Sequence, residues 1–238
     1  MLADTHKSMA SGKIEGPEID APIIAVVNFV ERILITFSDK YANSNIKIEK
    51  GLTQKLVLIL NSHALREYYP FWFDKEYMEV PERGDSPQVD IGTITTLEEG
   101  IVIGSKTYTD ESFFSLEAKR LGRLVSKRSK EYLIGRFENA KYVNCGGVER
   151  FKQGIHGKNL KYGAIIGYVQ EHDFTYWDGR INSWIDDLIQ KNLYSPVPWL
   201  LKDKLKKDYI RSTTAKFISI TSRKNDFITL FHLWARLN

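Results

Sequence analysis

Hydrophobic residues recur every three or four positions in several segments of the chain, a spacing that predicts amphipathic helices. The clearest predicted helices run from Ile23 to Asp39, from Glu49 to Asn61 and from Ile181 to Asn192. A short helix is predicted from Gly146 to Gln153. A longer and strongly basic helix is predicted from Gly122 to Asn139.

Runs of β-branched and aromatic residues, some with apolar and polar positions alternating, predict strands. The predicted strands are Phe71–Phe73, Tyr77–Val80, Gln88–Thr95, Ile101–Tyr108, Phe113–Leu121 and Ala164–Val169, followed by a closing hairpin of Lys216–Thr221 and Phe227–Ala235. Short turns join the three strands between residues 88 and 121, which indicates a meander. Helices and strands together predict an α/β or α+β fold with a mixed central sheet flanked by helices.

Composition narrows this prediction only slightly. Residues 1–20 are polar and without periodicity, so we expect a flexible tail there and a single domain over residues 21–238. The only cysteine is Cys145, which excludes an intramolecular disulfide and a zinc site built from cysteines. The longest apolar stretch is interrupted by polar residues and falls short of the roughly 18 residues that suggest a membrane span. We therefore expect a cytoplasmic protein without a membrane partner.

Two predicted strands carry charged residues that packing alone does not require. Side chains on a strand point alternately to its two faces, so Glu117 and Lys119 share one face and Leu116 and Ala118 take the other. Asp90 stands between two β-formers on an earlier strand, where burying an unpaired carboxylate is costly. The alternative explanation is that Asp90 faces solvent.

Two carboxylates that converge at one end of a sheet make an oxygen site suited to Mg²⁺. Such an ion polarises a phosphoryl oxygen and lowers the pKa of bound water. Lys119, next to Glu117, is suited to orienting that water or to stabilising developing negative charge.

These residues form a recognisable motif. Val89-Asp90-Ile91, followed by Ser115-Leu116-Glu117-Ala118-Lys119-Arg120-Leu121, resembles the PD-(D/E)xK nuclease superfamily, which has the restriction-endonuclease-like fold. The segment that begins at Glu49 resembles the first core helix of that superfamily. Residues 147–151 with 164–169 are similar to a helix-strand module of bacterial members, and residues 229–234 are similar to their closing strand.

The resemblance implies a nuclease that hydrolyses phosphodiester bonds with Mg²⁺, for which Mn²⁺ can substitute. By position, Asp90 and Glu117 are implied metal ligands, Lys119 the catalytic lysine, and Glu49 an accessory catalytic acid and metal ligand. DNA is the favoured substrate, in restriction or phage defence. Two departures from the family pattern are that Val89 replaces the proline and that a long gap separates Asp90 from Glu117, which leaves the pairing of their strands open.

A cluster of basic residues follows the Glu117/Lys119 strand. We predict that these residues contact nucleic acid: Arg120, Arg123, Lys127, Arg128 and Lys130. The alternative is an ordinary solvated face, since the net charge of the whole chain is only +4.

Two other functions remain open on the sequence. One is a non-catalytic nucleic-acid-binding module that retains the nuclease fold. The other is a protein-interaction subunit in which Glu117 and Lys119 form a surface ion pair worth roughly 0–1 kcal/mol. A homodimer is expected if the chain cuts both strands of a duplex, although no segment of the sequence marks an interface.

Overall fold

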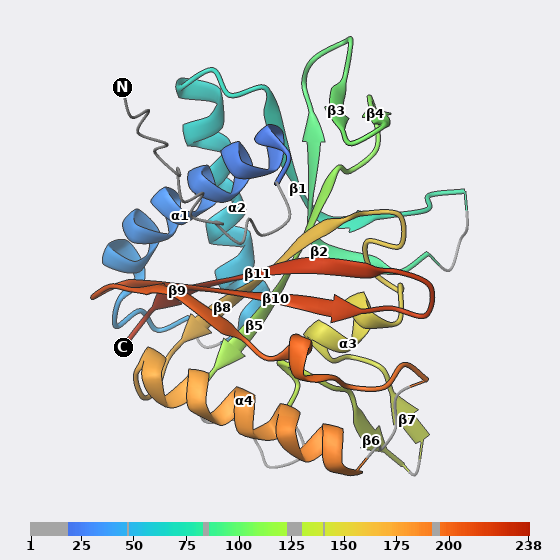
Figure 1. Cartoon of the computed structure of the whole chain (residues 1–238). Helices are drawn as coiled ribbons and strands as arrows, with labels where there is room; N and C mark the ends of the chain where they lie inside the picture. The colour runs from blue at the N-terminus through green and yellow to red at the C-terminus, as the bar shows by residue number, and fades with distance from the viewer. Residues whose placement is uncertain (1–18, 47, 83–85, 123–129, 140, 192–195) are drawn as a thin grey trace, which may run out of the picture.

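The computed structural model describes residues 19–46, 48–82, 86–122, 130–139, 141–191 and 196–238. Nearly all of the predicted tail, residues 1–18, lies outside these ranges. The predicted fold class is confirmed, because a mixed seven-stranded sheet lies between two layers of helices (Figure 1). The sheet has the strand order β1-β2-β5-β8-β11-β10-β9.

The helices agree closely with the apolar periodicity of the sequence. They are α1 (Ala21–Tyr41), α2 (Glu49–Arg66), α3 (Gly147–Lys152) and α4 (Phe174–Lys191), with a short 3-10 turn η2 (Leu201–Asp203). Helix α4 begins well before the predicted residue 181, because the Asp173 side chain accepts a hydrogen bond from the backbone N–H of Tyr176 and caps the helix.

The sheet strands are β1 (Phe71–Met78), β2 (Gln88–Thr95), β5 (Phe114–Leu121), β8 (Tyr162–Val169), β9 (Lys206–Ile210), β10 (Thr214–Ser222) and β11 (Phe227–Arg236). Strands β5, β8 and β11 are parallel neighbours at the centre. The outer pairs β1–β2, β2–β5, β9–β10 and β10–β11 are antiparallel. All eight residues of β8 are buried, as expected for a strand covered on both faces.

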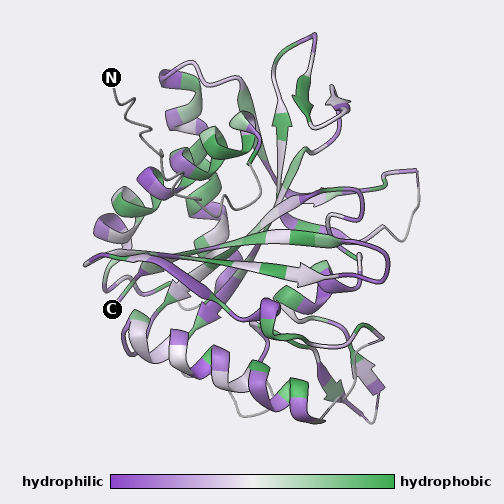
Figure 2. Ribbon diagram, viewed as in Figure 1, coloured by the Kyte–Doolittle hydropathy of each residue, from purple (hydrophilic) through white to green (hydrophobic). Residues whose placement is uncertain are grey.

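The two faces of the sheet carry separate apolar clusters. Helices α1 and α2 cover one face, where they bury Ile91, Leu116 and Ala118. Helices α3 and α4 cover the other face, where the buried residues include Leu121 and Trp234. Figure 2 shows hydrophobic residues along the strands and alternating with hydrophilic ones along α1 and α4. Because successive side chains of β5 point to opposite faces of the sheet, Glu117 and Lys119 point toward α3.

Two predicted elements are wrong. The described part of the predicted helix 122–139 holds turns and the strand β6 (Arg136–Glu138), which forms a hairpin with β7 (Lys141–Val143). The predicted strand 101–108 is a separate hairpin of β3 (Ile101–Ile103) and β4 (Lys106–Tyr108), which turns at Gly104 with a φ of 61°.

The second correction removes the predicted meander and answers the question of strand pairing. The β3–β4 hairpin projects from the sheet (Figure 1), and β2 pairs directly with β5. The long gap between Asp90 and Glu117 is therefore an excursion that leaves their strands adjacent.

Among the described helices, α1 alone is long and apolar enough to cross a membrane by length and composition. Its apolar face is buried against other elements of the fold, including β11 and α2. This packing is typical of a core helix.

Candidate active site

The predicted site lies where β2 and β5 separate. The two strands pair from Thr93 with Phe114 to Ile91 with Leu116. Beyond this point β2 leaves β5 but stays paired with β1 on its other side, as Val89 does with Tyr77. The backbone N–H of Ala118 then donates to Asp90 Oδ2 at 2.7 Å. We call the point beyond Ile91 and Leu116, where β2 and β5 separate, the fork. There the Asp90 side chain takes the place of a backbone hydrogen bond between the two strands, which fixes the position of its carboxylate.

Glu117 and Lys119 form a buried pair on β5. The Lys119 ammonium donates to Glu117 Oε1 at 2.7 Å and to the carbonyl oxygen of Ala118 at 3.0 Å. The side chains are only 1% exposed for Glu117 and 9% for Lys119. The interpretation of these residues as a surface ion pair is therefore wrong.

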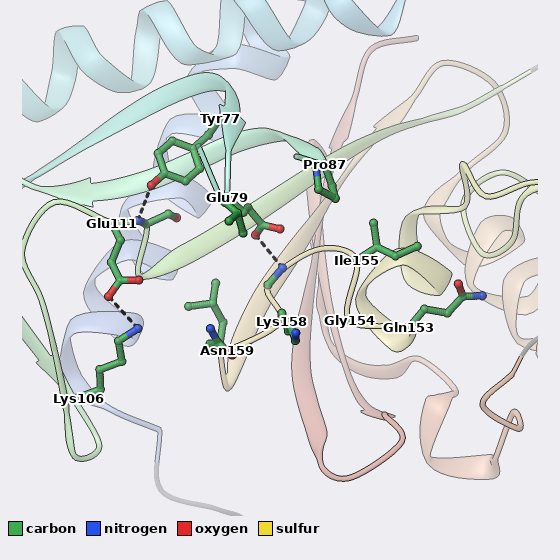
Figure 3. Close-up of a pocket in the computed structure, with 14 residues that line it drawn as sticks. Tyr77, Glu79, Pro87, Lys106, Glu111, Gln153, Gly154, Ile155, Lys158 and Asn159 are labelled. Atoms are coloured by element: carbon green, nitrogen blue, oxygen red, sulfur yellow. Dashed lines mark hydrogen bonds and ion pairs between the residues drawn. The ribbon is translucent and has the colours of Figure 1, made fainter. Parts of the chain in front are cut away.

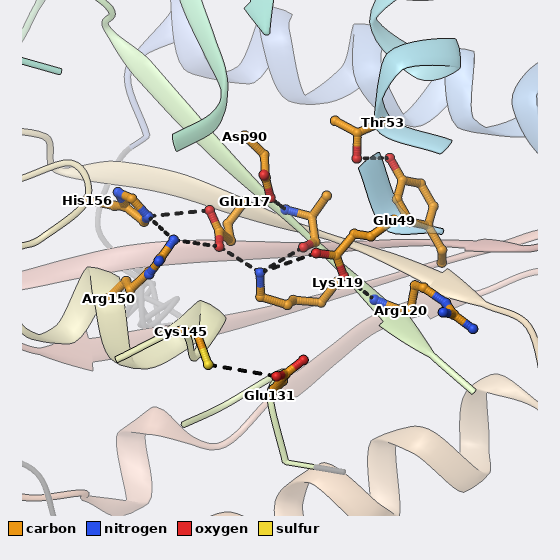
Figure 4. Close-up of polar contacts among 12 residues, drawn as sticks. Glu49, Thr53, Asp90, Glu117, Lys119, Arg120, Glu131, Cys145, Arg150 and His156 are labelled. Carbon is orange, nitrogen blue, oxygen red and sulfur yellow. Dashed lines mark hydrogen bonds and ion pairs between the residues drawn. The ribbon is translucent and has the colours of Figure 1, made fainter. Parts of the chain in front are cut away.

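Glu49 reaches the same place from the other side of the sheet. It is the first residue of α2, where a carboxylate also complements the helix dipole. Its Oε2 accepts a hydrogen bond from the backbone N–H of Arg120 at 3.0 Å, and its Oε1 lies 3.8 Å from Lys119 Nζ. Glu117 and Glu49 therefore approach the Lys119 ammonium directly, and Asp90 lies beside them, bound to the backbone of the residue between Glu117 and Lys119 (Figure 4).

The charges of this cluster act strongly on one another. Burial, reinforced by the negative charge of Glu117, raises the pKa of Asp90 to about 7. Burial by itself disfavours the charged form of Glu117, but electrostatic interactions with Lys119, His156 and Arg150 lower its pKa below the usual range. Burial likewise opposes the charge of Lys119, but the carboxylates of Glu117, Glu49 and Asp90 raise its pKa, so the ammonium stays protonated at neutral pH.

Three further polar side chains of the cluster, those of Arg150, His156 and Glu79, were not assigned to the site from the sequence. Arg150 Nη1 on α3 lies 3.5 Å from Glu117 Oε1 and 3.0 Å from His156 Nε2. The fully buried His156 lies between two carboxylates, with Nε2 3.5 Å from Glu117 Oε2 and Nδ1 3.6 Å from Glu79 Oε2. Glu79 in turn accepts hydrogen bonds from Ser115 Oγ and from the backbone N–H of Gly157.

The predicted basic cluster is only partly within the described residues. Arg123, Lys127 and Arg128 lie outside them. Arg120 Nε donates to Gln170 Oε1 at 2.6 Å, next to the site. Lys130 pairs with α4, since its Nζ lies 3.6 Å from an Asp187 carboxylate oxygen. The role of all five residues in binding nucleic acid stays a prediction.

A cavity of about 390 Å³ opens beside the cluster (Figure 3). Its wall includes Tyr77 from the end of β1 and Glu79 just after that strand, Lys106 from β4, and Lys158 and Asn159 from the loop that carries His156. Glu79 therefore lines this cavity and also faces His156, which connects the cavity to the carboxylates at the fork.

The carboxylates at the fork fit a divalent cation. Glu117 Oε2 is buried and accepts no hydrogen bond from a described residue, and the charges of Asp90 and Glu117 repel each other. Within the described ranges, no group of three or more His, Cys, Asp or Glu side chains is arranged to hold a metal ion. Mg²⁺ is commonly held by only one or two carboxylates plus water and substrate oxygens, so two carboxylates are as many as such a site needs. Glu49 as a third ligand stays a prediction.

Comparisons with family models, with curated proteins and with solved structures find no match to this chain.

Proposed function

We propose that this chain is a metal-dependent nuclease that hydrolyses phosphodiester bonds of nucleic acid, with DNA as the favoured substrate. The observation that carries the proposal is the convergence of Asp90, Glu117, Lys119 and Glu49 at one fork of the sheet. These residues come from three elements, and a core that needed only packing would not bring three carboxylates and a lysine together there.

Asp90 and Glu117 are the residues suited to hold Mg²⁺ or Mn²⁺, with Glu49 nearby. When bound, the metal would polarise a phosphoryl oxygen and lower the pKa of bound water. Lys119 stays protonated, so we assign it as a donor to the substrate phosphate or to the attacking water, and we exclude it as a general base. The β2–β5 fork and its neighbouring hydrogen bonds hold these groups in place before substrate binds.

The first test is cleavage of labelled single- and double-stranded DNA and RNA while Mg²⁺ or Mn²⁺ is titrated. We expect metal-dependent cleavage by the wild type and a loss of about 10²–10³-fold in Lys119→Ala, the range typical for removal of one transition-state donor. Lys55→Ala, which removes an exposed lysine from α2, is the matched control and should retain full activity.

Metal binding provides a readout that does not depend on finding the right substrate. Titration calorimetry with Mn²⁺ should detect a site in the wild type that is lost in Asp90→Asn and in Glu117→Gln. Absence of both metal binding and cleavage in the wild type would contradict the proposal.

One observation favours a second candidate, the non-catalytic nucleic-acid-binding module. Glu117 already has two cationic partners, Lys119 and Arg150, and the imidazole of His156 beside it, as a purely structural carboxylate would. This candidate predicts salt-dependent binding of nucleic acid without metal-dependent cleavage. The same titration therefore separates the two functions.

The expectations of a role in restriction or phage defence, of a homodimer and of a cytoplasmic location stay predictions. Sedimentation of the protein with and without a DNA duplex would test the dimer.

A further inference from the structure

Arg150 is the most exposed of the three side chains, Lys119, Arg150 and His156, that surround Glu117. Its side chain is 29% exposed, whereas those of Lys119 and His156 are 9% and 0% exposed. Of the three, the guanidinium group of Arg150 is therefore the most accessible to a ligand that comes from solvent. Arg150 lies within residues 147–151, which resemble part of a helix-strand module, but that resemblance gave this residue no role in the site.

The guanidinium group is held in a fixed position. Its Nε donates to the carbonyl oxygen of Asn144 at 3.1 Å, and its Nη1 faces His156 and Glu117. The helix that carries it is anchored by the fully buried pair of Lys152 and Asp203, whose charged atoms lie 2.8 Å apart. Arg150 is thus positioned before any ligand binds, which reduces the entropy lost on contact.

Part of the guanidinium group remains available to a ligand. Within the described part of the chain, Nη2 donates no hydrogen bond, whereas the Lys119 ammonium already donates to Glu117 and to the Ala118 carbonyl. A planar guanidinium group presents paired donors that match the oxygens of a phosphate, which a lysine ammonium cannot do.

We infer that Arg150 contacts a non-bridging oxygen of the phosphate that is cleaved, next to Glu117. This inference rests on the proposed function, since it assigns a residue to the same site. During hydrolysis a water oxygen forms a bond to phosphorus and loses a proton to solvent, while the bond from phosphorus to the leaving sugar oxygen breaks and that oxygen takes up a proton from solvent. Negative charge gathers on the non-bridging oxygens in the transition state. Arg150 stabilises this charge as a donor and transfers no proton.

The competing explanation is that Arg150 only neutralises buried Glu117. Arg150→Lys distinguishes the two, because lysine keeps the charge but loses the paired donors. We expect Arg150→Lys to lower kcat by about 10²-fold with KM changed less than about threefold. The thermal unfolding midpoint should stay near that of the wild type. Arg180→Lys, at an exposed arginine on α4, is the matched control and should leave kcat unchanged.

Measurement of oligonucleotide binding provides a second, independent test, the binding arm of the experiment. In the Lys119→Ala background, which leaves the substrate intact, adding Arg150→Ala should weaken binding of a labelled oligonucleotide by about tenfold in the presence of Mg²⁺. It should also reduce the salt dependence of binding by about one phosphate contact.

The outcomes separate failure of the inference from failure of the proposed function. If the wild type cleaves and Arg150→Lys keeps its kcat, the inference is wrong and the nuclease proposal stands. If the wild type does not cleave, the binding arm decides, and an unchanged affinity and salt dependence in Arg150→Ala would overturn the inference. A wild type that neither cleaves nor binds would overturn both.

Discussion

Asp90 is a single residue of the site whose ionisation lowers the stability of the folded protein. Its carboxylate accepts a hydrogen bond from the Ala118 N–H and is repelled by the negative charge of Glu117. Burial and this repulsion raise its pKa to about 7, whereas an aspartate in an unfolded chain titrates near 3.9. The folded protein therefore binds this proton more tightly than the unfolded chain does.

It follows that ionisation of Asp90 destabilises the fold progressively as the pH rises from about 4 to about 7. Asp90→Asn removes the ionisation and keeps an oxygen for the Ala118 N–H. With EDTA present, we expect the variant to exceed the wild type in free energy of unfolding by about 1–3 kcal/mol near pH 8. The difference should approach zero near pH 4.

Urea unfolding at a series of pH values measures this effect. Asp74→Asn, which alters an exposed carboxylate on β1, is the matched control and should give a difference that does not grow with pH. A constant difference for Asp90→Asn as well would contradict the assignment.

The residue scale also marks the limit of what the sequence predicts. Asp90, Glu117, Lys119 and Glu49 were found because each has a position in a recognisable strand or helix pattern. Arg150 lies in a correctly predicted helix, but neither it nor His156 was assigned to the site, because their proximity to Glu117 depends on how α3 and the loop after it fold back onto β5. Periodicity along the chain carries no information about that contact.

Among the secondary structure elements, the sequence was most informative where one physical effect dominates. The bounds of β2 are predicted correctly, because its β-formers lie between clear turns. The predicted strand 101–108 failed because Gly104-Ser105 is a hairpin turn, a signal that was present in the sequence.

The predicted helix 122–139 failed for a different reason. Tyr132 and Leu133 are buried, but they lie in a turn that packs beneath α3, so their apolar spacing imitated a helix. Gly135 approaches the β7 backbone so closely that a Cβ atom there would lie 2.1 Å from the carbonyl oxygen of Val143. Only the tertiary structure reveals that requirement.

Replacing a glycine by alanine should change the free energy of unfolding in opposite directions in β8 and in α4. A Cβ atom at Gly167 on β8 would lie 2.3 Å from the Trp234 ring, whereas one at Gly179 on α4 would meet no atom within 4 Å. We expect Gly167→Ala to lower the free energy of unfolding by about 1–3 kcal/mol through overpacking. Gly179→Ala should raise it by up to about 1 kcal/mol, because alanine favours the helix.

Urea unfolding of the two variants and the wild type would measure both changes. A neutral Gly167→Ala would mean that Trp234 has room to move, which would contradict the tight packing of β8 against β11.

For the whole molecule, α1 is the element that closes the core. It covers one face of the sheet and contacts β11, and Ser38 Oγ donates to the carbonyl oxygen of Arg236, 198 positions later in the chain. The backbone N–H of Asn43 donates to the carbonyl oxygen of Leu237 at 3.2 Å. The first described helix and the last strand therefore stabilise each other.

Two substitutions on α1 test this role. Val30 is fully buried and Ile24 is 43% exposed, although both are apolar residues of the same helix. We expect Val30→Asp to abolish cooperative unfolding, because an unpaired buried carboxylate costs several kcal/mol. Ile24→Asp should shift the unfolding midpoint only slightly. Equal tolerance of both substitutions would contradict the packing of α1 as a core helix.

The contact between α1 and β11 has a consequence for synthesis of the protein on the ribosome. Helix α1 is made long before β11, so the part of its apolar face that packs on β11 stays uncovered until almost two hundred further residues have been made. Until then a nascent chain exposes a surface that chaperones and proteases recognise. A fragment released before β11 is made keeps that surface exposed, so the cell can remove it before it accumulates beside the complete protein.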